Sequence, residues 1–93
     1  LANATERGAQ FTERLRDADP DGVVDVRGKG LLLGVECGTK ERRDDVMEAA
    51  LQRGFLMLGC GYRTLRILPP LDVRKREIDL AVDLLAESFA ATQ

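Results

Sequence analysis

The sequence contains no histidine and no tryptophan, only two cysteines and three prolines, and just 4% aromatic residues. Without histidine, these residues cannot supply a Ser-His-Asp triad, a histidine-ligated metal site or imidazole acid–base chemistry. Two cysteines alone do not complete a zinc site. No apolar run approaches the roughly 20 residues that cross a bilayer, so no membrane-spanning segment is expected.

An excess of charge of one sign is also missing. The 93 residues carry 14 basic and 16 acidic side chains, which gives a formal net charge of −2. This balance offers no electrostatic basis for binding nucleic acid or an anionic membrane, so neither partner is expected. With 44% hydrophobic and 32% charged residues, the composition predicts a single folded domain over residues 1–93.

Cys37 and Cys60 do not form a C-x-x-C pair. The favoured interpretation is two small apolar side chains in a reducing cytoplasm, while a disulfide between them is left open. No basic and apolar leader opens the sequence, which agrees with a cytoplasmic location. The first residue is Leu1 rather than methionine, which suggests a piece of a longer protein.

Hydrophobic periodicity predicts three helices and four strands in the order α-β-β-α-β-β-α. The expected helices are residues 1–18, 43–52 and 74–90, and the expected strands are residues 23–26, 31–37, 55–58 and 64–68. Residues 27–30 interrupt the first two strands, and residues 59–61 form a loop. Short strands joined by glycine turns predict an α+β two-layer sandwich, with a mostly antiparallel small sheet and the helices on one face.

The same periodicity assigns individual side chains. Leu31, Leu33 and Val35 should share the core face of their strand. Ala18 and Arg53 fall on the inner stripes of the first two helices, whereas Arg7 falls on an outer face. No clean capping box is visible before the last helix.

Arg66 is the candidate binding residue. It lies in a strand just before Pro69-Pro70, and alternation places it on the face opposite Leu65 and Ile67. A guanidinium held at its backbone can grip a carboxylate through two parallel hydrogen bonds. An ordinary solvent-facing arginine is the alternative, and spacing alone favours that alternative.

The other candidates have simpler explanations. Backbone N–H groups around Gly28–Gly30 and Gly59–Gly61 could cradle a phosphate, but neither segment fits a dinucleotide or P-loop motif, so both are interpreted as tight turns. The three lysines have polar or glycine neighbours and are expected to be solvated rather than to form Schiff bases: Lys29, Lys40 and Lys75. The acidic pairs Asp44-Asp45 and Asp79/Asp83 are expected on helix surfaces, balanced by nearby arginines.

Three motifs, in order, resemble the class III aminotransferases. They are the stretch from Val26 to Glu36, the segment from Gly54 to Leu58, and the run Leu65-Arg66-Ile67-Leu68-Pro69-Pro70-Leu71. A closing helix with an apolar stripe follows them. The resemblance covers nearly the whole chain, and it implies the C-terminal small domain of a fold type I enzyme that uses pyridoxal phosphate.

The resemblance implies a function for Arg66. In that family the corresponding arginine binds a substrate carboxylate, with Gly61 and Tyr62 as possible neighbours, while Arg27 and Gly28 have a structural role. The full-length enzyme would move an amino group from an ω-amino acid, such as 4-aminobutyrate or N-acetylornithine, to a 2-oxo acid such as 2-oxoglutarate. It would act as a homodimer, and a large catalytic domain would hold the pyridoxal phosphate and the Schiff-base lysine.

No catalytic, cofactor-binding or metal-binding residue is assigned in these 93 residues, so the chain alone is expected to be inactive. A second interpretation remains open. The chain could be a stand-alone, non-catalytic module that binds small carboxylates or dimerises.

Overall fold

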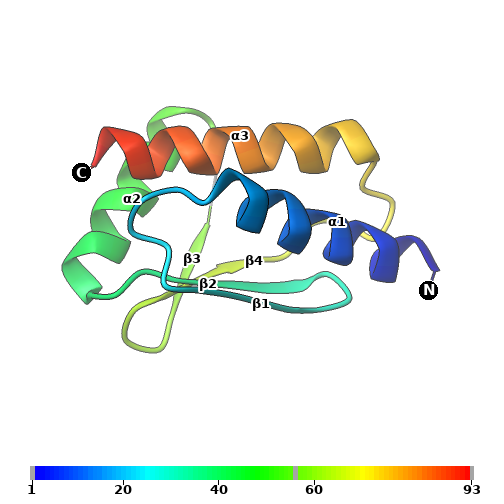
Figure 1. The fold of residues 1–93 in the computed structure, drawn as a ribbon, viewed down its shortest axis with the longest axis horizontal. Helices are drawn as coiled ribbons and strands as arrows, with labels where there is room; N and C mark the ends of the chain where they lie inside the picture. Colours follow the sequence, from blue (N-terminus) through cyan, green and yellow to red (C-terminus); the bar gives the residue numbers. More distant parts are fainter. Residues whose placement is uncertain (1, 56, 93) are drawn as a thin grey trace.

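The computed structural model describes residues 2–55 and 57–92, and their elements follow the predicted order (Figure 1). Leu1 and Leu56, which belong to two of the predicted elements, lie outside the described residues. The elements are α1 (Ala2–Ala18), β1 (Asp25–Lys29), β2 (Leu32–Glu36), α2 (Lys40–Gln52), β3 (Leu58–Cys60), β4 (Thr64–Ile67) and α3 (Lys75–Ala91).

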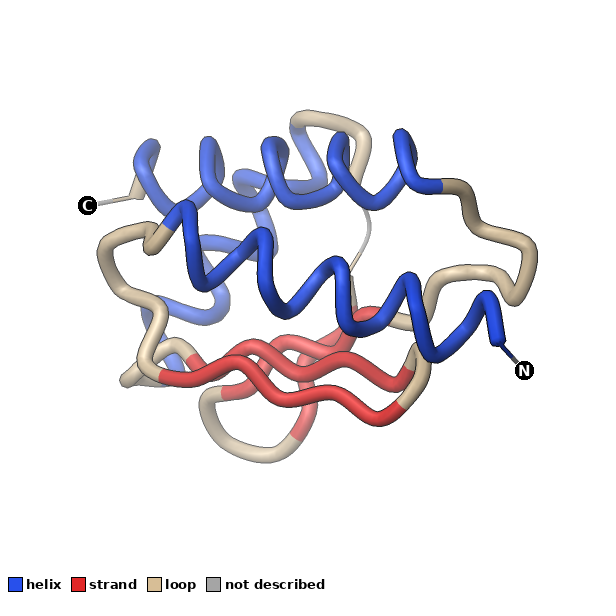
Figure 2. The backbone as a smooth tube through the Cα atoms, turned by 45° about the vertical axis from the view of Figure 1, so that its right-hand side comes forward, coloured by secondary structure: helices blue, strands red, loops and turns tan. Residues whose placement is uncertain are grey.

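The strands form one antiparallel sheet in the order β1-β2-β4-β3. β4 therefore lies inside the sheet, with a hydrogen-bonded neighbour on each side. The helices gather on one side of the sheet and leave its other face open (Figure 2). This arrangement confirms the predicted α+β two-layer sandwich.

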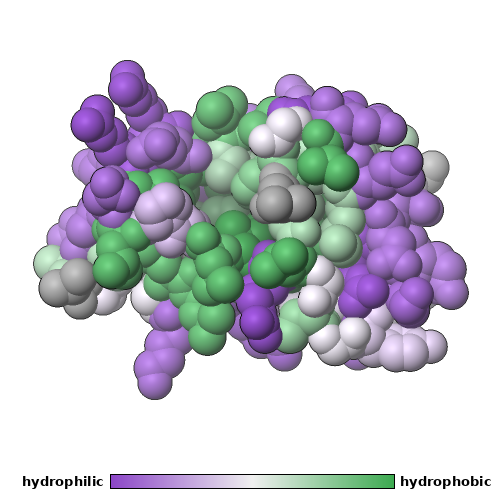
Figure 3. All heavy atoms as spheres, turned by 180° about the vertical axis from the view of Figure 1, so that it is seen from behind, coloured by the Kyte–Doolittle hydropathy of each residue, from purple (hydrophilic) through white to green (hydrophobic). Residues whose placement is uncertain are grey.

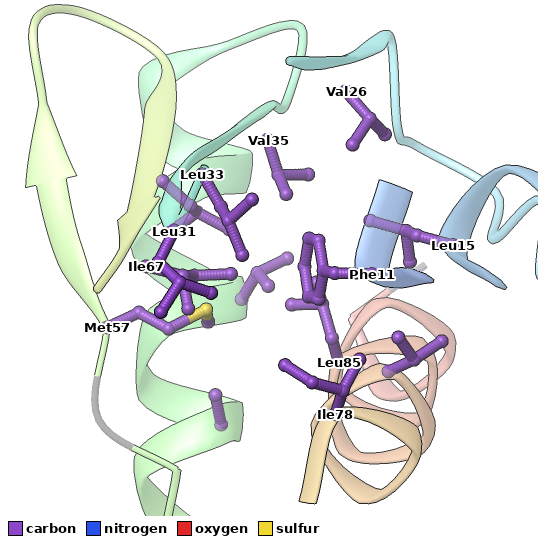
Figure 4. Packing of buried hydrophobic residues seen from close by; sticks show 14 of the residues in the cluster. Phe11, Leu15, Val26, Leu31, Leu33, Val35, Met57, Ile67, Ile78 and Leu85 are labelled. Carbon is purple, nitrogen blue, oxygen red and sulfur yellow. The ribbon is translucent and has the colours of Figure 1, made fainter. Parts of the chain in front are cut away.

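The core lies between the helices and the covered face of the sheet (Figure 4). In β2 the predicted alternation is confirmed, because Leu33 and Val35 are buried while Leu32 is 56% exposed. Phe11 from α1 reaches between the strands and α3, where Leu85 is also fully buried. Burying a side chain of this size contributes about 1.5–3 kcal/mol, so these contacts hold the two layers together.

The helix α1 crosses the β1–β2 turn at very close range. A Cβ atom added to Gly8 would lie only 1.9 Å from the carbonyl oxygen of Gly30. Gly30 itself has φ 58°, in the left-handed region that glycine adopts without strain. The two glycines together allow the helix backbone to rest on the hairpin.

The strand β1 is longer than predicted and begins later. The prediction ended the strand at Val26 because glycine and lysine disfavour strands. In the structure Gly28 pairs with Leu33 and Lys29 pairs with Leu32 across the antiparallel ladder. Pairing with a neighbouring strand therefore overrides the local propensity.

The strand β3 is displaced in the same way. The predicted strand was 55–58, with Gly59 and Cys60 in a loop, but β3 covers Leu58–Cys60. Gly59 pairs with Leu65 and Cys60 pairs with Thr64 of β4. Of the predicted loop, only Gly61 lies in the turn, with φ 64°.

Several side chains differ from their predicted environment. Arg7, assigned to an outer helix face, is only 6% exposed and hydrogen-bonds to Gln10. Ala18 and Arg53, assigned to inner stripes, are exposed. Arg53 instead turns back along α2 and donates to the carbonyl oxygen of Ala49 at 2.9 Å. A long arginine side chain can lie along an apolar surface or turn toward solvent, and the spacing of residues in the sequence does not reveal which.

Two helix starts also differ from prediction. α2 begins at Lys40 because the Thr39 hydroxyl caps it, accepting the backbone N–H of Arg42 at 3.1 Å. α3 begins after Arg74, whose backbone N–H donates to the Glu77 carboxylate at 2.8 Å. Glu77 thus supplies the carboxylate half of a capping box, which the sequence analysis did not identify.

Candidate functional site

Arg66 lies on the open face of the sheet, in the central strand β4. Its neighbours Leu65 and Ile67 are buried, so the predicted alternation is confirmed and the Arg66 side chain points away from the helices. Its backbone is paired on both sides, with Gly34 of β2 and Leu58 of β3. Two ladders therefore fix the base of this side chain.

The register places a row of residues across the open face. Arg27 is paired with Gly34, Gly34 with Arg66, and Arg66 with Leu58. Adjacent strands lie about 4.8 Å apart, so the two arginines stand roughly 10 Å apart at their backbones with a glycine between them.

A shallow cavity of about 380 Å³ lies over the Arg27, Gly34 and Arg66 part of this row. It is lined by Arg27, Gly28, Lys29, Leu32, Leu33, Gly34, Cys60, Thr64 and Arg66. The lining combines apolar side chains with three cationic ones, those of Arg27, Lys29 and Arg66. A cavity of this kind suits a small organic molecule that carries a negative charge at one end.

The Arg66 guanidinium has no carboxylate within ion-pairing distance among residues 2–55 and 57–92. Its Nη2 atom donates to the Cys60 sulfur at 3.1 Å. By contrast, Arg63 pairs with Glu36 at 3.1 Å, and Arg27 lies 3.9 Å from the same carboxylate. Most of the hydrogen-bond donors of the Arg66 guanidinium thus have no partner among the described residues.

Gly61 and Tyr62, named beside Arg66 in the sequence analysis, lie in the β3–β4 turn. Tyr62 is 75% exposed, and the Gly61 carbonyl oxygen accepts a hydrogen bond from Arg43 at 3.1 Å. Cys60 belongs to the loop that the resemblance placed near this pocket, but it lies in β3 and contacts Arg66 directly. Alternation in β2 places Gly34 on the outward face, but sequence reasoning missed that Gly34 lies beside Arg66, because that depends on strand pairing.

The two cysteines are both free thiols. Cys37 is fully buried, and this burial raises the pKa of its thiol to about 11. Cys60 is half-buried at the cavity. Their separate positions agree with the favoured interpretation of two unlinked thiols.

The lysines and most of the acids are exposed, as their spacing predicts, while Asp79 is half-buried. Lys29, Lys40 and Lys75 are all exposed, and Lys40 pairs with Asp44 at 3.2 Å. A hydrogen bond from Arg43 lowers the pKa of Asp44.

Asp79 joins α3 to α1. Gln10 donates to the Asp79 carboxylate at 2.8 Å and Arg14 donates to it at 2.9 Å. These hydrogen bonds, that from Gln10 above all, lower the pKa of Asp79. The Asp79 carboxylate thus links the two helices.

The reverse side of the molecule carries hydrophobic side chains around a hollow (Figure 3). A mainly apolar cavity of about 250 Å³ lies where the β4–α3 connection meets α1 and α3. Its lining includes Phe11, Phe55, Pro69, Val73 and Ile78. None of the described helices has the length and apolar character needed to cross a membrane.

The structure is a small α+β domain with helices on one face of an antiparallel sheet and an arginine in the inner strand β4. The sequence model of the family described as aminotransferase class-III matches residues 1–89. The chain therefore belongs to the class III aminotransferase family.

Individual relatives agree with this assignment. The chain is 43% identical over 79 residues to the mitochondrial acetylornithine aminotransferase of Neurospora crassa, covering 85% of this chain and 17% of that protein. It is 37% identical over 91 residues to the acetylornithine aminotransferase of Bacillus subtilis (strain 168), covering 97% of this chain and 23% of that protein. The structure of lysine aminotransferase from M. tuberculosis superposes with a TM-score of 0.91 at 32% identity, covering 98% of this chain and 22% of that one. The chain thus spans about a fifth of the length of these relatives.

Proposed function

We propose that this chain is the C-terminal small domain of a pyridoxal-phosphate-dependent transaminase. The full-length protein would move an amino group from an ω-amino acid, such as 4-aminobutyrate or N-acetylornithine, to a 2-oxo acid such as 2-oxoglutarate. Membership of the class III family supports this proposal, as do relatives whose names specify acetylornithine and lysine.

One observation carries the proposal: Arg66 presents its guanidinium to a cavity without a carboxylate partner among the described residues. Substrates of this class carry a carboxylate, and arginine binds carboxylates with two parallel hydrogen bonds. Because β4 is paired on both sides, the guanidinium is held at a defined place and can orient the substrate. Arg66 is therefore assigned the substrate carboxylate.

The residues of this chain do not fit the cofactor itself. Pyridoxal phosphate supplies the electron sink for amino transfer and needs a lysine held in a suitable environment. Lys29, Lys40 and Lys75 are exposed on the surface. We assign the cofactor to a large domain in the rest of the protein, against which the open face of the sheet would pack.

We also infer a homodimer in the cytoplasm. Membership of the family supports the homodimer. The cytoplasm agrees with the free thiols of Cys37 and Cys60, since reducing compartments keep cysteines unlinked.

The test replaces Arg66 in the full-length protein. Hydrogen bonds to charged groups contribute about 1.5–3 kcal/mol, so Arg66→Ala should raise the KM for a carboxylate-bearing substrate by about 10- to 150-fold. Arg66→Lys keeps the positive charge but not the two parallel N–H donors of the guanidinium, so it should recover only part of the lost affinity. Arg63→Ala is the matched control, because Arg63 is exposed nearby without lining the cavity.

Unchanged affinity and turnover in the Arg66→Ala enzyme would show that the carboxylate is held elsewhere. The alternative function, a stand-alone carboxylate-binding module, is tested on the 93-residue chain alone. Calorimetry measures whether glutarate binds to this chain. Saturable binding would support the stand-alone module, whereas no binding is expected if the site also needs the large domain.

A further inference from the structure

The glycine opposite Arg66 has no structural reason to be a glycine. Of the nine glycines, all of which are described, five have positive φ and three others would bring a Cβ within 3.1 Å of a neighbouring atom. Gly34 belongs to neither group. Its nearest neighbour for an added Cβ is the Thr64 methyl at 3.6 Å, which is an ordinary contact.

The position of Gly34 makes this unusual. It lies inside β2, paired on one side with β1 and on the other with β4. Glycine in the interior of a strand is less stable than alanine and has no side chain to pack. Where the fold does not require such a glycine, it often marks the close approach of a ligand or another backbone.

The surroundings of Gly34 indicate which of these approaches. It lies between Arg27 and Arg66 in the row across the open face, inside the 380 Å³ cavity. Arg66 hydrogen-bonds to Cys60 of β3, on the far side of β4 from Gly34. The Arg66 side chain thus leans toward β3 and leaves open space over Gly34 within the same cavity. Among the described residues, only the Thr64 methyl and the Arg27 carbonyl oxygen lie within 4 Å of a Cβ built on Gly34. This space suits the negatively charged end of a small acid.

We propose that Gly34 is a specificity-determining residue, whose missing side chain leaves the floor on which the carboxylate end of the substrate lies beside Arg66. This inference rests on the proposed function of Arg66. A larger residue at this position would stand beside the Arg66 side chain, because the Cβ atoms of paired residues on one face lie about 4.5–5.5 Å apart. It would prevent the substrate carboxylate from accepting hydrogen bonds from two N–H groups of the Arg66 guanidinium.

The experiment uses the full-length protein with Gly34→Val and Gly34→Ala. A misplaced methyl group in a binding site costs about tenfold or more, so the valine variant should raise the KM for 4-aminobutyrate or N-acetylornithine at least tenfold. The alanine variant adds one carbon instead of three and should show a smaller rise, near the lower end of this range at about tenfold. In both variants kcat should change much less than KM, and glutarate should inhibit more weakly. Val24→Leu is the control, because it adds bulk to an exposed side chain outside the cavity.

A double variant distinguishes this effect from a general disturbance of the sheet. In the Arg66→Ala background, Gly34→Val should raise KM little further, since both changes remove the same contact. Unchanged KM in the valine variant, with a damaged Arg66→Ala enzyme, would overturn the role of Gly34 and leave the proposed function intact. Unchanged KM in both single variants would overturn both. Should the valine variant lose its thermal unfolding transition, the alanine variant decides, and an unchanged KM there overturns the inference.

Discussion

The contact between Gly8 and Gly30 predicts that Gly8→Ala destabilises the chain, although helix propensity alone predicts that it stabilises it. Gly8 lies in the middle of α1, where alanine is normally better than glycine by about 1 kcal/mol. Here an alanine methyl would meet the Gly30 carbonyl oxygen at 1.9 Å and its carbonyl carbon at 2.8 Å. Both atoms belong to the backbone, so no side-chain rotation can relieve the clash.

The size of the effect follows from the displacement. Carbon–oxygen contacts in proteins lie at about 3.3–3.6 Å, so the helix and the hairpin would have to separate by more than 1 Å. Overpacking of this kind costs about 1–3 kcal/mol, and a backbone clash belongs at the upper end. After the gain in helix propensity, Gly8→Ala should lower the free energy of unfolding by about 2 kcal/mol.

Urea unfolding of the 93-residue chain, followed by circular dichroism, measures this change. With a slope near 1 kcal/mol per molar urea, the midpoint should fall by about 2 M. Gly34→Ala is the matched control, since its Cβ has room and it should gain about 0.5–1 kcal/mol. A Gly8→Ala chain as stable as the parent, or more stable, would refute the reasoning.

The remaining predictions concern the thiols and the α1–α3 contact. Because the folded chain raises the pKa of Cys37 from 9.0 to about 11, stability should be intact below pH 9 and fall between pH 9 and 11, by about 3 kcal/mol in all. Cys37→Ala should remove this dependence and Cys60→Ala should not. A thiol reagent at neutral pH should label half-buried Cys60 in the native chain and Cys37 only after unfolding; rapid labelling of both would contradict the buried position of Cys37. The folded pKa of Asp79 is lowered, so its contribution to stability should be present above about pH 4 and lost as pH falls further. Asp79→Asn should weaken that acid sensitivity, and an unchanged acid profile would mean that the Gln10 hydrogen bond adds little.

The parts of the fold that sequence reasoning found are those that depend on local periodicity. Leu33, Val35, Leu65 and Ile67 alternate with outward residues, and their burial is what alternation predicts. The order of the helices and strands follows from the same signal. Family resemblance, rather than periodicity, was needed to assign a function to Arg66.

The errors share one physical cause, which is tertiary structure acting on weak local signals. Gly28 and Gly59 read as breaks, yet both lie in strands because a neighbouring strand completes their hydrogen bonds. Arg43 pairs with Asp44 at 3.0 Å, as an arginine beside an acidic pair can, but its burial, which no local pattern predicted, includes a hydrogen bond to the Gly61 carbonyl eighteen residues away. The periodicity of one segment does not reveal which residues of a distant segment will pair or hydrogen-bond with it.

The same limit applies to the site. Gly34 and Arg66 are thirty-two positions apart in the sequence, and only the register of β2 against β4 brings them together. The contact between Arg66 and Cys60 likewise requires β3 to extend beyond its predicted end.

The central position of β4 also affects how tightly an acid can be held. A side chain that is immobilised on binding loses about 0.5–1.5 kcal/mol of conformational freedom, and a mobile backbone would add to that loss. The ladders on both sides of β4 have already ordered the backbone of Arg66, and the Cys60 sulfur restricts its guanidinium. Most of that entropy is therefore lost during folding, so a substrate encounters an arginine that is largely preorganised, and more of the hydrogen-bond energy remains for affinity.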